Sequence, residues 1–479
     1  MKFFTRYKKK QVNYFLLFLG VVLVFWIVYL NKIRNKSTEE TTSVTGDLEQ
    51  ILEAGVLRAV VDYNSTNYFI YRGRPMGFQF ELLQLLSKDM GVKLDIKVSN
   101  NLEETFNGLK NGNYDLIAKN LTITQARRSE VDFTVPLQKT RQVLVQREKS
   151  KNENDSVYIN GTRKLAGKKV YVQKNTSYSR RLQRLSEEIG EKIEIIEDSV
   201  FGVEQLIARV ANSEIDCTVC DENVALLNKT YYPNLDVSLR ISFPQNIAWA
   251  ISKGSPEWKA WLNNWILEIR DSRKYKQLYH KYFESPRIAR RMEDELHSIN
   301  GGKISVYDDI IKELAKNYKW DWRLIASMIY NESRFNEDAD SWNGAYGLMQ
   351  LLPATAEAFG IENYMDPKQN IRAGILFLNW IDNQLKESLP DSTERIKFDL
   401  AAYNIGLGHI FDAQRLAAKY GKDSNVWENN VDSFLIRKSM KKFYTDSVVY
   451  YGYARGKEAV DYVQRVTNNY HHYLNLIEK

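Results

Sequence analysis

The sequence predicts a multidomain protein in which a two-lobed α/β domain is followed by an all-α domain. A chain of 479 residues suggests about three compact units. Short β-rich runs alternate with amphipathic helical runs over residues 51–286, whereas nearly every segment of residues 305–479 has helical spacing. An apolar segment near the N-terminus precedes both regions.

The first 36 residues are typical of an N-terminal signal anchor or signal peptide. Residues 14–30 form a run of 17 residues without a charge, which is close to the lower limit for crossing a bilayer. Five basic residues precede this run and three follow closely, an asymmetry that favours a cytoplasmic N-terminus. No small-x-small cleavage site follows, so we favour an uncleaved inner-membrane anchor. A cleaved signal would instead leave the protein peripheral on the outer membrane, and in both cases the rest of the chain is expected in the periplasm.

Residues 37–50 are predicted to form a tether, and residues 51–286 the α/β domain. Within it, VLRAVVDY and LDIKVS are typical of strands, and FELLQLLSKDMG between them is typical of an amphipathic helix that ends at a glycine. Strands separated by helices predict mostly parallel sheets with helices on both faces. A second such group begins at LAGKKVYVQK, and the length suffices for two lobes. Ligands of such folds bind at the carboxyl ends of the strands.

The only two cysteines, Cys217 and Cys220, are predicted to be buried residues of one strand. They occur in EIDCTVCDEN, and residues three apart on a strand lie roughly 10 Å from each other, which is beyond disulfide reach. The sequence therefore predicts no disulfide framework and, since no ligand cluster surrounds them, plain core cysteines.

Glu332 stands where the apolar pattern of DWRLIASMIYNESRF ends. Leu324, Ile325, Met328 and Ile329 share one helical face, and Glu332 follows the last two by four and three residues. If the helix continues to Glu332, its carboxyl lies at the edge of the buried face, where desolvation raises its pKa. A protonated carboxyl near neutral pH is what a general acid for a glycosidic oxygen requires. From spacing alone, a solvated glutamate in the last helical turn fits equally well.

Two glycine-rich stretches favour the first interpretation. Gly344 and Gly347 leave backbone free of side chains, as a groove for a bulky polymer would need. A second glycine-rich turn, at residues 406–408, follows Tyr403 and Asn404.

These motifs together resemble the soluble-lytic-transglycosylase type of lysozyme-like domain. The chain has Glu332–Ser333, then GAYGLMQLLPATA, NIRAGILFL, AYNIGLGH and VDYVQRV in the order of that family. The resemblance implies that Glu332 is the single catalytic acid and base. It also implies that six residues line the glycan groove: Ser333, Met349, Gln350, Tyr403, Asn404 and Tyr462. The Tyr-Val motif is preceded by EAVD rather than by the family's usual ETRN-like residues, which makes Tyr462 the weakest of these assignments.

The resemblance implies cleavage of the β-1,4 bond between N-acetylmuramic acid and N-acetylglucosamine in peptidoglycan, with formation of 1,6-anhydromuramic ends. An oriented intramolecular hydroxyl has an effective molarity of up to 10⁵–10⁸ M, so positioning can favour it over water. A hydrolytic muramidase is the alternative, because Glu337, Asp338 and Asp340 follow Glu332 and one of them could hold a water.

Residues 51–286 resemble the periplasmic solute-binding proteins of the amino-acid type. The stretches RGRPMGFQFELLQLL, GNYDLIAKNLTITQARRSEVDFTVP and LAGKKVYVQKNTSY carry the resemblance. It implies that Arg127 clamps a ligand carboxylate and that Asp221 holds an amine. Thr122, Glu81 and Tyr68 are further candidates for ligand contact, although Tyr68 fits the core of the lobe equally well.

Both resemblances in this order are similar to the membrane-bound lytic murein transglycosylase F type, with residues 287–304 as a linker. That family implies a catalytic domain regulated by an amino acid or muropeptide bound in the first domain. A third hypothesis is a tethered sensor or wall-binding protein without cleavage activity. The net charge of +7 is mild, no basic run indicates nucleic acid, and no metal or nucleotide cofactor is implied.

Overall fold

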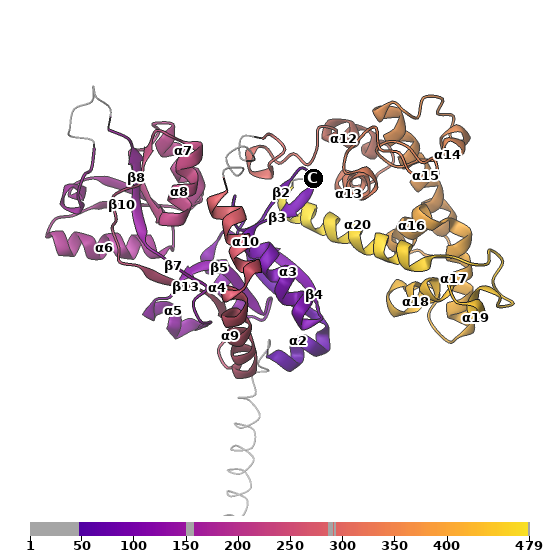
Figure 1. Cartoon of the computed structure of the whole chain (residues 1–479), viewed down its shortest axis with the longest axis horizontal. Helices are drawn as coiled ribbons and strands as arrows, with labels where there is room; N and C mark the ends of the chain where they lie inside the picture. Colours follow the sequence, from indigo (N-terminus) through magenta and orange to yellow (C-terminus); the bar gives the residue numbers. More distant parts are fainter. Residues whose placement is uncertain (1–46, 150–157, 286–290, 292–293, 478–479) are drawn as a thin grey trace, which may run out of the picture.

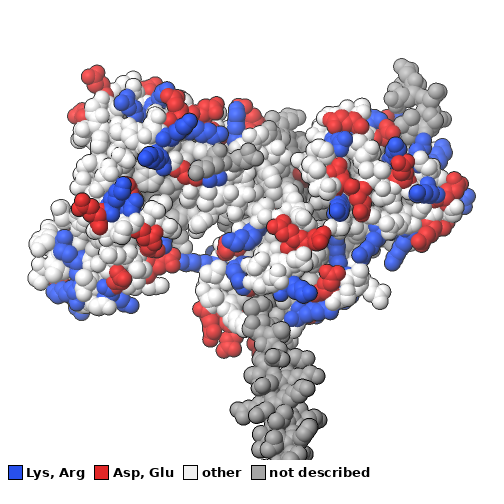
Figure 2. All heavy atoms as spheres, turned by 180° about the vertical axis from the view of Figure 1, so that it is seen from behind, with Lys and Arg blue, Asp and Glu red and all other residues white. Residues whose placement is uncertain are grey.

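The protein was analysed as a computed structural model that describes residues 47–149, 158–285, 291 and 294–477. Two α/β lobes and one helical domain make up these residues (Figure 1). The apolar run 14–30, on which the anchor prediction depends, lies outside the described residues. Within the ranges just given, no helix is long and apolar enough to cross a membrane. On the face shown in Figure 2, acidic and basic side chains are interspersed over all three bodies.

The first lobe is built on a six-stranded sheet in the order β4-β1-β5-β13-β6, with β7 paired to β13. Its strands are β1 (Val56–Val61), β4 (Lys93–Val98), β5 (Leu116–Thr122), β6 (Asp132–Phe133), β7 (Gln138–Thr140) and β13 (Gln245–Ile251). Its helices are α2 (Leu48–Ala54), α3 (Phe78–Met90), α4 (Leu102–Lys110), α5 (Gln125–Glu130), α9 (Pro256–Asp271), α10 (Arg273–Tyr279) and the short π-helix η2 (His280–Glu284).

The second lobe has a five-stranded sheet in the order β10-β9-β11-β8-β12. Its strands are β8 (Gln142–Arg147), β9 (Lys169–Gln173), β10 (Glu194–Asp198), β11 (Cys217–Asp221) and β12 (Leu235–Asp236). Its helices are η1 (Thr162–Leu165), α6 (Ser177–Ile189), α7 (Val203–Ala211) and α8 (Glu222–Tyr231). Leu144 packs into one apolar cluster and Val143 and Val145 into another, so both faces of this sheet are covered.

The expectation of mostly parallel sheets holds for only part of each lobe. β4, β1 and β5 are parallel, as are β10, β9 and β11, but β13 runs antiparallel to β5 and β8 antiparallel to β11. The physical reason is that the chain crosses between the lobes twice, and the crossing strands enter each sheet from the opposite end. Cys217 and Cys220 lie in β11, buried and not disulfide-bonded, as predicted.

The helical domain surrounds one large apolar cluster. Its helices are α12 (Asp308–Asn317), α13 (Trp322–Ser333), α14 (Pro353–Ala358), α15 (Pro367–Leu385), α16 (Ser392–Ile405), α17 (Leu407–Lys419), η4 (Trp427–Val431), α18 (Asp432–Arg437), α19 (Lys441–Tyr444) and α20 (Gly456–Leu476). The long helix α20 packs against α13, α16 and α18 and then reaches the first lobe (Figure 1).

A short β-hairpin of the first lobe, formed by β2 (Phe69–Tyr71) and β3 (Arg74–Met76), packs on the helical domain; we call it the docking hairpin. The Tyr473 hydroxyl of α20 donates a hydrogen bond of 2.6 Å to the carbonyl oxygen of Gly73, in the turn of the hairpin. Beside it, the Tyr68 hydroxyl lies 2.6 Å from Nδ1 of His472. The Asn475 side-chain amide donates to the carbonyl of Ile96 in β4. The two domains are thus joined through side chains at the end of one helix.

The described part of the expected linker, residues 294–304, packs against the docking hairpin. The His297 ring is buried and stacks on Phe69, with centroids 4.4 Å apart. Ser298, which begins the 3-10 helix η3 (Ser298–Asn300), accepts a hydrogen bond from the backbone N–H of Ile70 at 2.9 Å. This segment is therefore part of the contact between the domains rather than a solvated connection.

Candidate functional site

Glu332 lies in the last turn of α13, as the spacing predicted for an intact helix. The Asp321 side chain caps the start of the helix by accepting from the N–H of Arg323, and Arg334 ends it in the left-handed conformation at φ 56°. Leu324, Ile325, Met328 and Ile329 are all buried. Glu332 itself is partly buried at the end of this apolar face.

The surroundings of Glu332 favour its protonated form. Burial raises the pKa of the Glu332 carboxyl to about 7, while the Tyr462 hydroxyl and the positive charge of Arg465 lower the pKa in part. Tyr462 comes from α20 and Tyr403 from α16, and the pKa of each phenol is raised by burial and by the nearby Glu332. Three helices thus place two tyrosines and one arginine around a single carboxyl that titrates near neutral pH.

Three of the predicted groove residues hold the loop that follows the glutamate. The Ser333 hydroxyl donates to the carbonyl of Leu348 at 2.8 Å, and the Tyr403 hydroxyl donates to the carbonyl of Met349 at 3.0 Å. Gln350 adopts φ 47°, and its side-chain amide donates to the carbonyl of Ala339 at 2.8 Å. Asn404 is exposed beside Tyr403. Ser333, Tyr403 and Gln350 thus support one loop, and Tyr403 and Tyr462 lie close enough to Glu332 for its charge to raise their pKa values.

Two residues of this loop, Gly347 and Met349, have a different physical role from the one expected. Gly344 has open space around it, but a side chain at Gly347 would collide with Asn370, so Gly347 serves close packing rather than a groove. Met349 is fully buried and fills the space over Gly374, while its N–H donates to the side-chain Oδ1 of Asn370 at 2.8 Å. Its side chain belongs to the core, and only its backbone carbonyl contacts Tyr403.

The acidic residues of the loop after Glu332 are exposed and accept hydrogen bonds from tyrosines. Glu337 accepts from the Tyr307 hydroxyl at 2.8 Å, and Asp338 from the Tyr346 hydroxyl at 3.3 Å. These contacts give both carboxylates a role in holding the loop.

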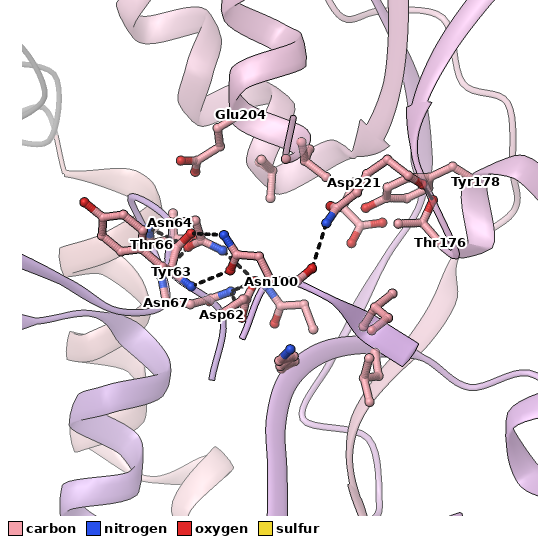
Figure 3. A pocket seen from close by; sticks show the side chains of 18 of the residues that line it. Asp62, Tyr63, Asn64, Thr66, Asn67, Asn100, Thr176, Tyr178, Glu204 and Asp221 are labelled. Atoms are coloured by element: carbon pink, nitrogen blue, oxygen red, sulfur yellow. Dashed lines mark hydrogen bonds between the residues drawn. The ribbon is translucent and has the colours of Figure 1, made fainter. Parts of the chain in front are cut away.

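A second site lies between the two lobes, where a cavity of about 200 Å³ is lined by residues of both. Of the predicted ligand residues, Arg127, Asp221 and Thr122 line it. Figure 3 shows Asp221 and Tyr178 on one side of the cavity, and Asp62, Asn64 and Asn67 on the other.

Arg127 and Asp221 are both charged groups with few protein partners. Arg127 donates to the carbonyls of Thr122 at 3.1 Å and Asn175 at 3.5 Å, and burial lowers its pKa to about 10. Burial raises the pKa of Asp221 to about 7, and among the described residues its Oδ1 has no hydrogen-bond partner. A partly buried guanidinium that the described residues give no carboxylate partner, and a buried carboxyl with one oxygen that lacks a donor, suit a ligand that carries both opposite charges.

The other two predicted ligand residues lie outside the cavity. Glu81 lies on helix α3. Its carboxylate accepts hydrogen bonds of 2.5 Å from Lys281 and from the Tyr282 hydroxyl, both of η2. Tyr68 is fully buried and contacts His472. Glu81 was a candidate through the resemblance to solute-binding proteins and Tyr68 as a possible cover of the ligand, but the side chain of each makes a packing contact instead.

The lobes are closed on each other by hydrogen bonds across the cavity. The N–H and hydroxyl of Ser65 donate to the two carboxylate oxygens of Glu204, at 2.9 and 2.5 Å. Gln173 donates to the carbonyl of Asn100 at 3.1 Å. Asp62, Lys119 and Glu204 also line the cavity, and sequence reasoning missed all three because no local motif marks them.

Comparisons with known proteins match both halves of the chain. Residues 57–285 match the family of bacterial extracellular solute-binding proteins, family 3, and residues 309–426 match the transglycosylase SLT domain. A protein of Desulfosudis oleivorans named membrane-bound lytic murein transglycosylase F is 32% identical over 424 residues, covering 88% of this chain and 91% of the relative. A Pseudomonas fluorescens protein of the same name is 32% identical over 428 residues, covering 88% and 85%. A solved ancestral amino acid-binding protein is 24% identical and covers 50% of this chain and 99% of its own, with a TM-score of 0.43.

Proposed function

The chain belongs to the membrane-bound lytic murein transglycosylase F family and is a peptidoglycan lytic transglycosylase, and we propose that Glu332 is its single catalytic acid and base. The observation that carries this assignment is a carboxyl with a pKa of about 7 at the end of a buried helix, between tyrosines from two other helices. A group with a pKa near the working pH can both donate and accept a proton.

The reaction then needs only one protein carboxyl. Protonated Glu332 gives its proton to the glycosidic oxygen as the bond from C1 of N-acetylmuramic acid to that oxygen breaks. The N-acetyl oxygen of the same sugar stabilises the positive charge at C1. The Glu332 carboxylate next removes the proton of the C6 hydroxyl, whose oxygen bonds to C1 and forms the 1,6-anhydro ring. Tyr462 and Arg465 favour the charged intermediate state of Glu332, because both lower its pKa.

The test is Glu332→Gln on purified peptidoglycan, with Glu337→Gln as the matched control. Loss of a general acid and base typically costs about 10²–10⁴-fold in rate, so we expect at least this loss for Glu332→Gln and nearly full activity for the control. Mass spectrometry of the wild-type products should show anhydro ends, which are lighter by one water. Full residual activity of the glutamine variant would exclude Glu332, and hydrated ends would indicate a muramidase.

We further propose that the inter-lobe cavity binds a small regulatory ligand, with Arg127 and Asp221 as a clamp for its carboxylate and amine. The docking hairpin links this cavity to α13, the helix that carries Glu332. Asn67 lines the cavity and immediately precedes Tyr68 and β2. At the other end of β2, a side chain on Gly73 would lie 2.8 Å from Tyr330 and 2.6 Å from Phe335, which flank Glu332 on either side. A ligand that shifts the lobes would act on the helix end that carries the acid.

The regulatory proposal is tested by finding a ligand that thermally stabilises the first domain and measuring cleavage with and without it. We expect the rate to change in the presence of the ligand, since both events involve the docking hairpin. An unchanged rate at saturating ligand would contradict the coupling, while leaving the catalytic assignment untouched.

The protein acts at a membrane in the periplasm, as the family name and the solute-binding domain indicate. We propose residues 14–30 as an uncleaved anchor, with residues 51–286 as the ligand domain and 305–479 as the catalytic domain. Deletion of residues 1–36, replaced by a cleavable signal, should move the protein to the soluble periplasmic fraction. Retention of the truncated protein in the membrane fraction would contradict this anchor.

A further inference from the structure

The cavity between the lobes has an excess of negative charge. The charged residues that line it are the carboxylates of Asp62, Glu204 and Asp221 and the cations of Lys119 and Arg127. An amino acid held by the proposed clamp would pair its own carboxylate with Arg127 and its α-ammonium with Asp221. On the far side of the cavity this leaves two carboxylates against one lysine.

The lysine on that side is already engaged with its own lobe. Lys119 donates to the carbonyl of Ser99 at 2.5 Å and to the Thr105 hydroxyl at 2.6 Å. It also attracts Asp62, which accepts from the side-chain amides of Asn64 and Asn67. Among the described residues, the hydrogen bonds that Glu204 accepts come from the uncharged Ser65. The negative charge of one carboxylate in this part of the cavity is therefore left without a cationic partner among its lining residues.

Hydrogen-bond acceptors without donors point to the same kind of ligand. Asn67 and Asp221 both line the cavity and are 1% and 5% exposed, and in each the buried Oδ1 atom has no hydrogen-bond partner among the described residues. Asn67 commits its amide nitrogen to Asp62, which fixes the oxygen as the free atom. These acceptors lie on opposite sides of the cavity (Figure 3). A buried acceptor without a donor is destabilised, so each calls for an N–H group of a ligand.

We propose that the cavity binds an α-amino acid with a second cationic nitrogen at the end of its side chain, an amine or a guanidinium, placed among Asp62, Asn67 and Glu204. This inference rests on the proposed regulatory function and specifies the chemistry of its ligand. The cavity volume of about 200 Å³ lies below the roughly 300–1,000 Å³ typical of pockets for drug-sized ligands, which suits a single amino acid rather than a glycan with its peptide.

The burial of Asp62 and Glu204 explains how their side of the cavity selects a cation. Burial raises the pKa values of Asp62 and Glu204, so both carboxylates are destabilised while the cavity lacks a cationic ligand. An apolar side chain of equal length would leave this destabilisation in place. We therefore expect discrimination of roughly 10- to 100-fold between two ligands that differ only in the terminal amine, as for a hydrogen bond to a charged group.

The experiment compares L-lysine with L-norleucine, which has the same carbon chain without the terminal amine. Binding to the full-length protein is measured by calorimetry, and peptidoglycan cleavage is measured in the same samples. We expect L-lysine to bind at least tenfold more tightly than L-norleucine. Equal binding of the two, or tighter binding of L-norleucine, would overturn the second cation site and leave the carboxylate–amine clamp standing.

Variants separate the two sides of the cavity. Glu204→Gln and Asp62→Asn keep an acceptor oxygen for Ser65 and the asparagines, so each should reduce the preference for L-lysine while L-norleucine still binds. Asp221→Asn should weaken both ligands alike, and the exposed Glu214→Gln of the same lobe should change neither. If Glu204→Gln and Asp62→Asn each keep the full preference, the inference is wrong. If neither amino acid binds the wild type, the ligand proposal fails as a whole, while cleavage in the same samples still reports on Glu332.

Discussion

The Tyr473 hydroxyl donates its hydrogen bond to the carbonyl oxygen of Gly73 across the boundary between the two domains. Gly73 has φ 74°, a conformation that costs other residues about 1–2 kcal/mol. A Cβ atom at this position would also lie 2.6 Å from the Phe335 ring. Two independent reasons therefore favour glycine at this position of the turn. The second is the close contact with Phe335, just after the helix α13 that carries Glu332.

Gly73→Ala should disturb catalysis from outside the catalytic domain. The added methyl group would press on Tyr330 and Phe335, which stand before and after Glu332 in the sequence, and overpacking of this kind costs typically about 1–3 kcal/mol. We expect a several-fold change in the rate of peptidoglycan cleavage and a lower unfolding temperature.

Gly91→Ala is the matched control, since Gly91 has φ 71° in the same lobe with nothing within 4 Å of the added methyl. It should show only the backbone cost, with an unchanged cleavage rate. Equal cleavage rates for the two variants would show that the hairpin contact does not reach Glu332.

The pH dependence of cleavage should follow Glu332. Its pKa of about 7 means that the acid form needed for the first step is lost as the pH rises through 7. We expect the rate to fall above about pH 7, measured on purified peptidoglycan at constant ionic strength. A flat rate between pH 6 and 9 would contradict the assigned role.

The same shift predicts that Glu332→Gln stabilises the fold at alkaline pH. Between the ordinary value of 4.5 and about 7, the folded protein keeps a proton that the unfolded chain releases, so stability falls as the pH rises. At pH 8 the variant avoids this loss, and we expect it to be more stable than the wild type by roughly 1–2 kcal/mol, allowing for partial exposure. At pH 4 the two proteins should unfold alike in chemical denaturation.

The cleavage rate should decline on the alkaline side of its pH profile, which we call the alkaline limb. Tyr462→Phe should shift this limb to higher pH. The Tyr462 hydroxyl lowers the pKa of Glu332, so its removal raises that pKa further. Tyr403→Phe is the comparison, because its hydroxyl donates to the carbonyl of Met349. It should leave the limb in place while reducing stability through the lost hydrogen bond. A limb that shifts equally in both variants would argue against a specific role of Tyr462.

A buried ion pair in the helical domain should contribute strongly to stability. Lys438 and Asp412 are both fully buried and 2.5 Å apart, and Asp412 also accepts from the N–H groups of Tyr450 and Tyr451. Asp412→Asn leaves the lysine charge buried without a carboxylate, which typically costs about 3–5 kcal/mol.

The exposed pair of Lys368 and Glu313 provides the control, and Glu313→Gln should cost about 0–1 kcal/mol. The pKa of Asp412 is lowered by Lys438 and the two N–H groups, against the effect of burial. Its contribution is therefore present above the unfolded pKa and is lost as the pH falls. Denaturant unfolding over a series of pH values from 7 downward measures both effects, and a stability difference between wild type and Asp412→Asn that does not narrow as the pH falls below the ordinary value of 3.8 would contradict the explanation.

The sequence predicts α13, the helix that carries Glu332, well because its information is local. Four apolar side chains at helical spacing define the buried face, and they place Glu332 at its edge without any knowledge of the fold. Tyr462 lies on a helix far along the chain, so only resemblance to a family could bring it to the glutamate. Gly347 and Met349 show the opposite case, since the residue types were noticed but their packing partners, Asn370 and Gly374, were not predictable from local pattern.

The lobes and the contact between the domains were harder to predict, because some strands are short and because the direction in which strands pair is not a local property. β2 and β3 have three residues each, too few for a periodic signal, although they form the contact with the helical domain. The antiparallel pairing of β8 and β13 depends on where the chain crosses, which no single strand encodes. Glu204 and Asp62 become neighbours of one cavity only after the lobes close.

Helix α20 contributes Tyr462 to the surroundings of Glu332 and Asn475 to the first lobe. At 1.5 Å per residue, the two residues stand about 20 Å apart on one rod. A tilt of about 3° around the lobe end moves the tyrosine by about 1 Å, and a misplacement of that size in an active site can cost about 10²-fold in rate. Such a lever would let the enzyme be slowed or released by a rigid rotation, with every helix still folded.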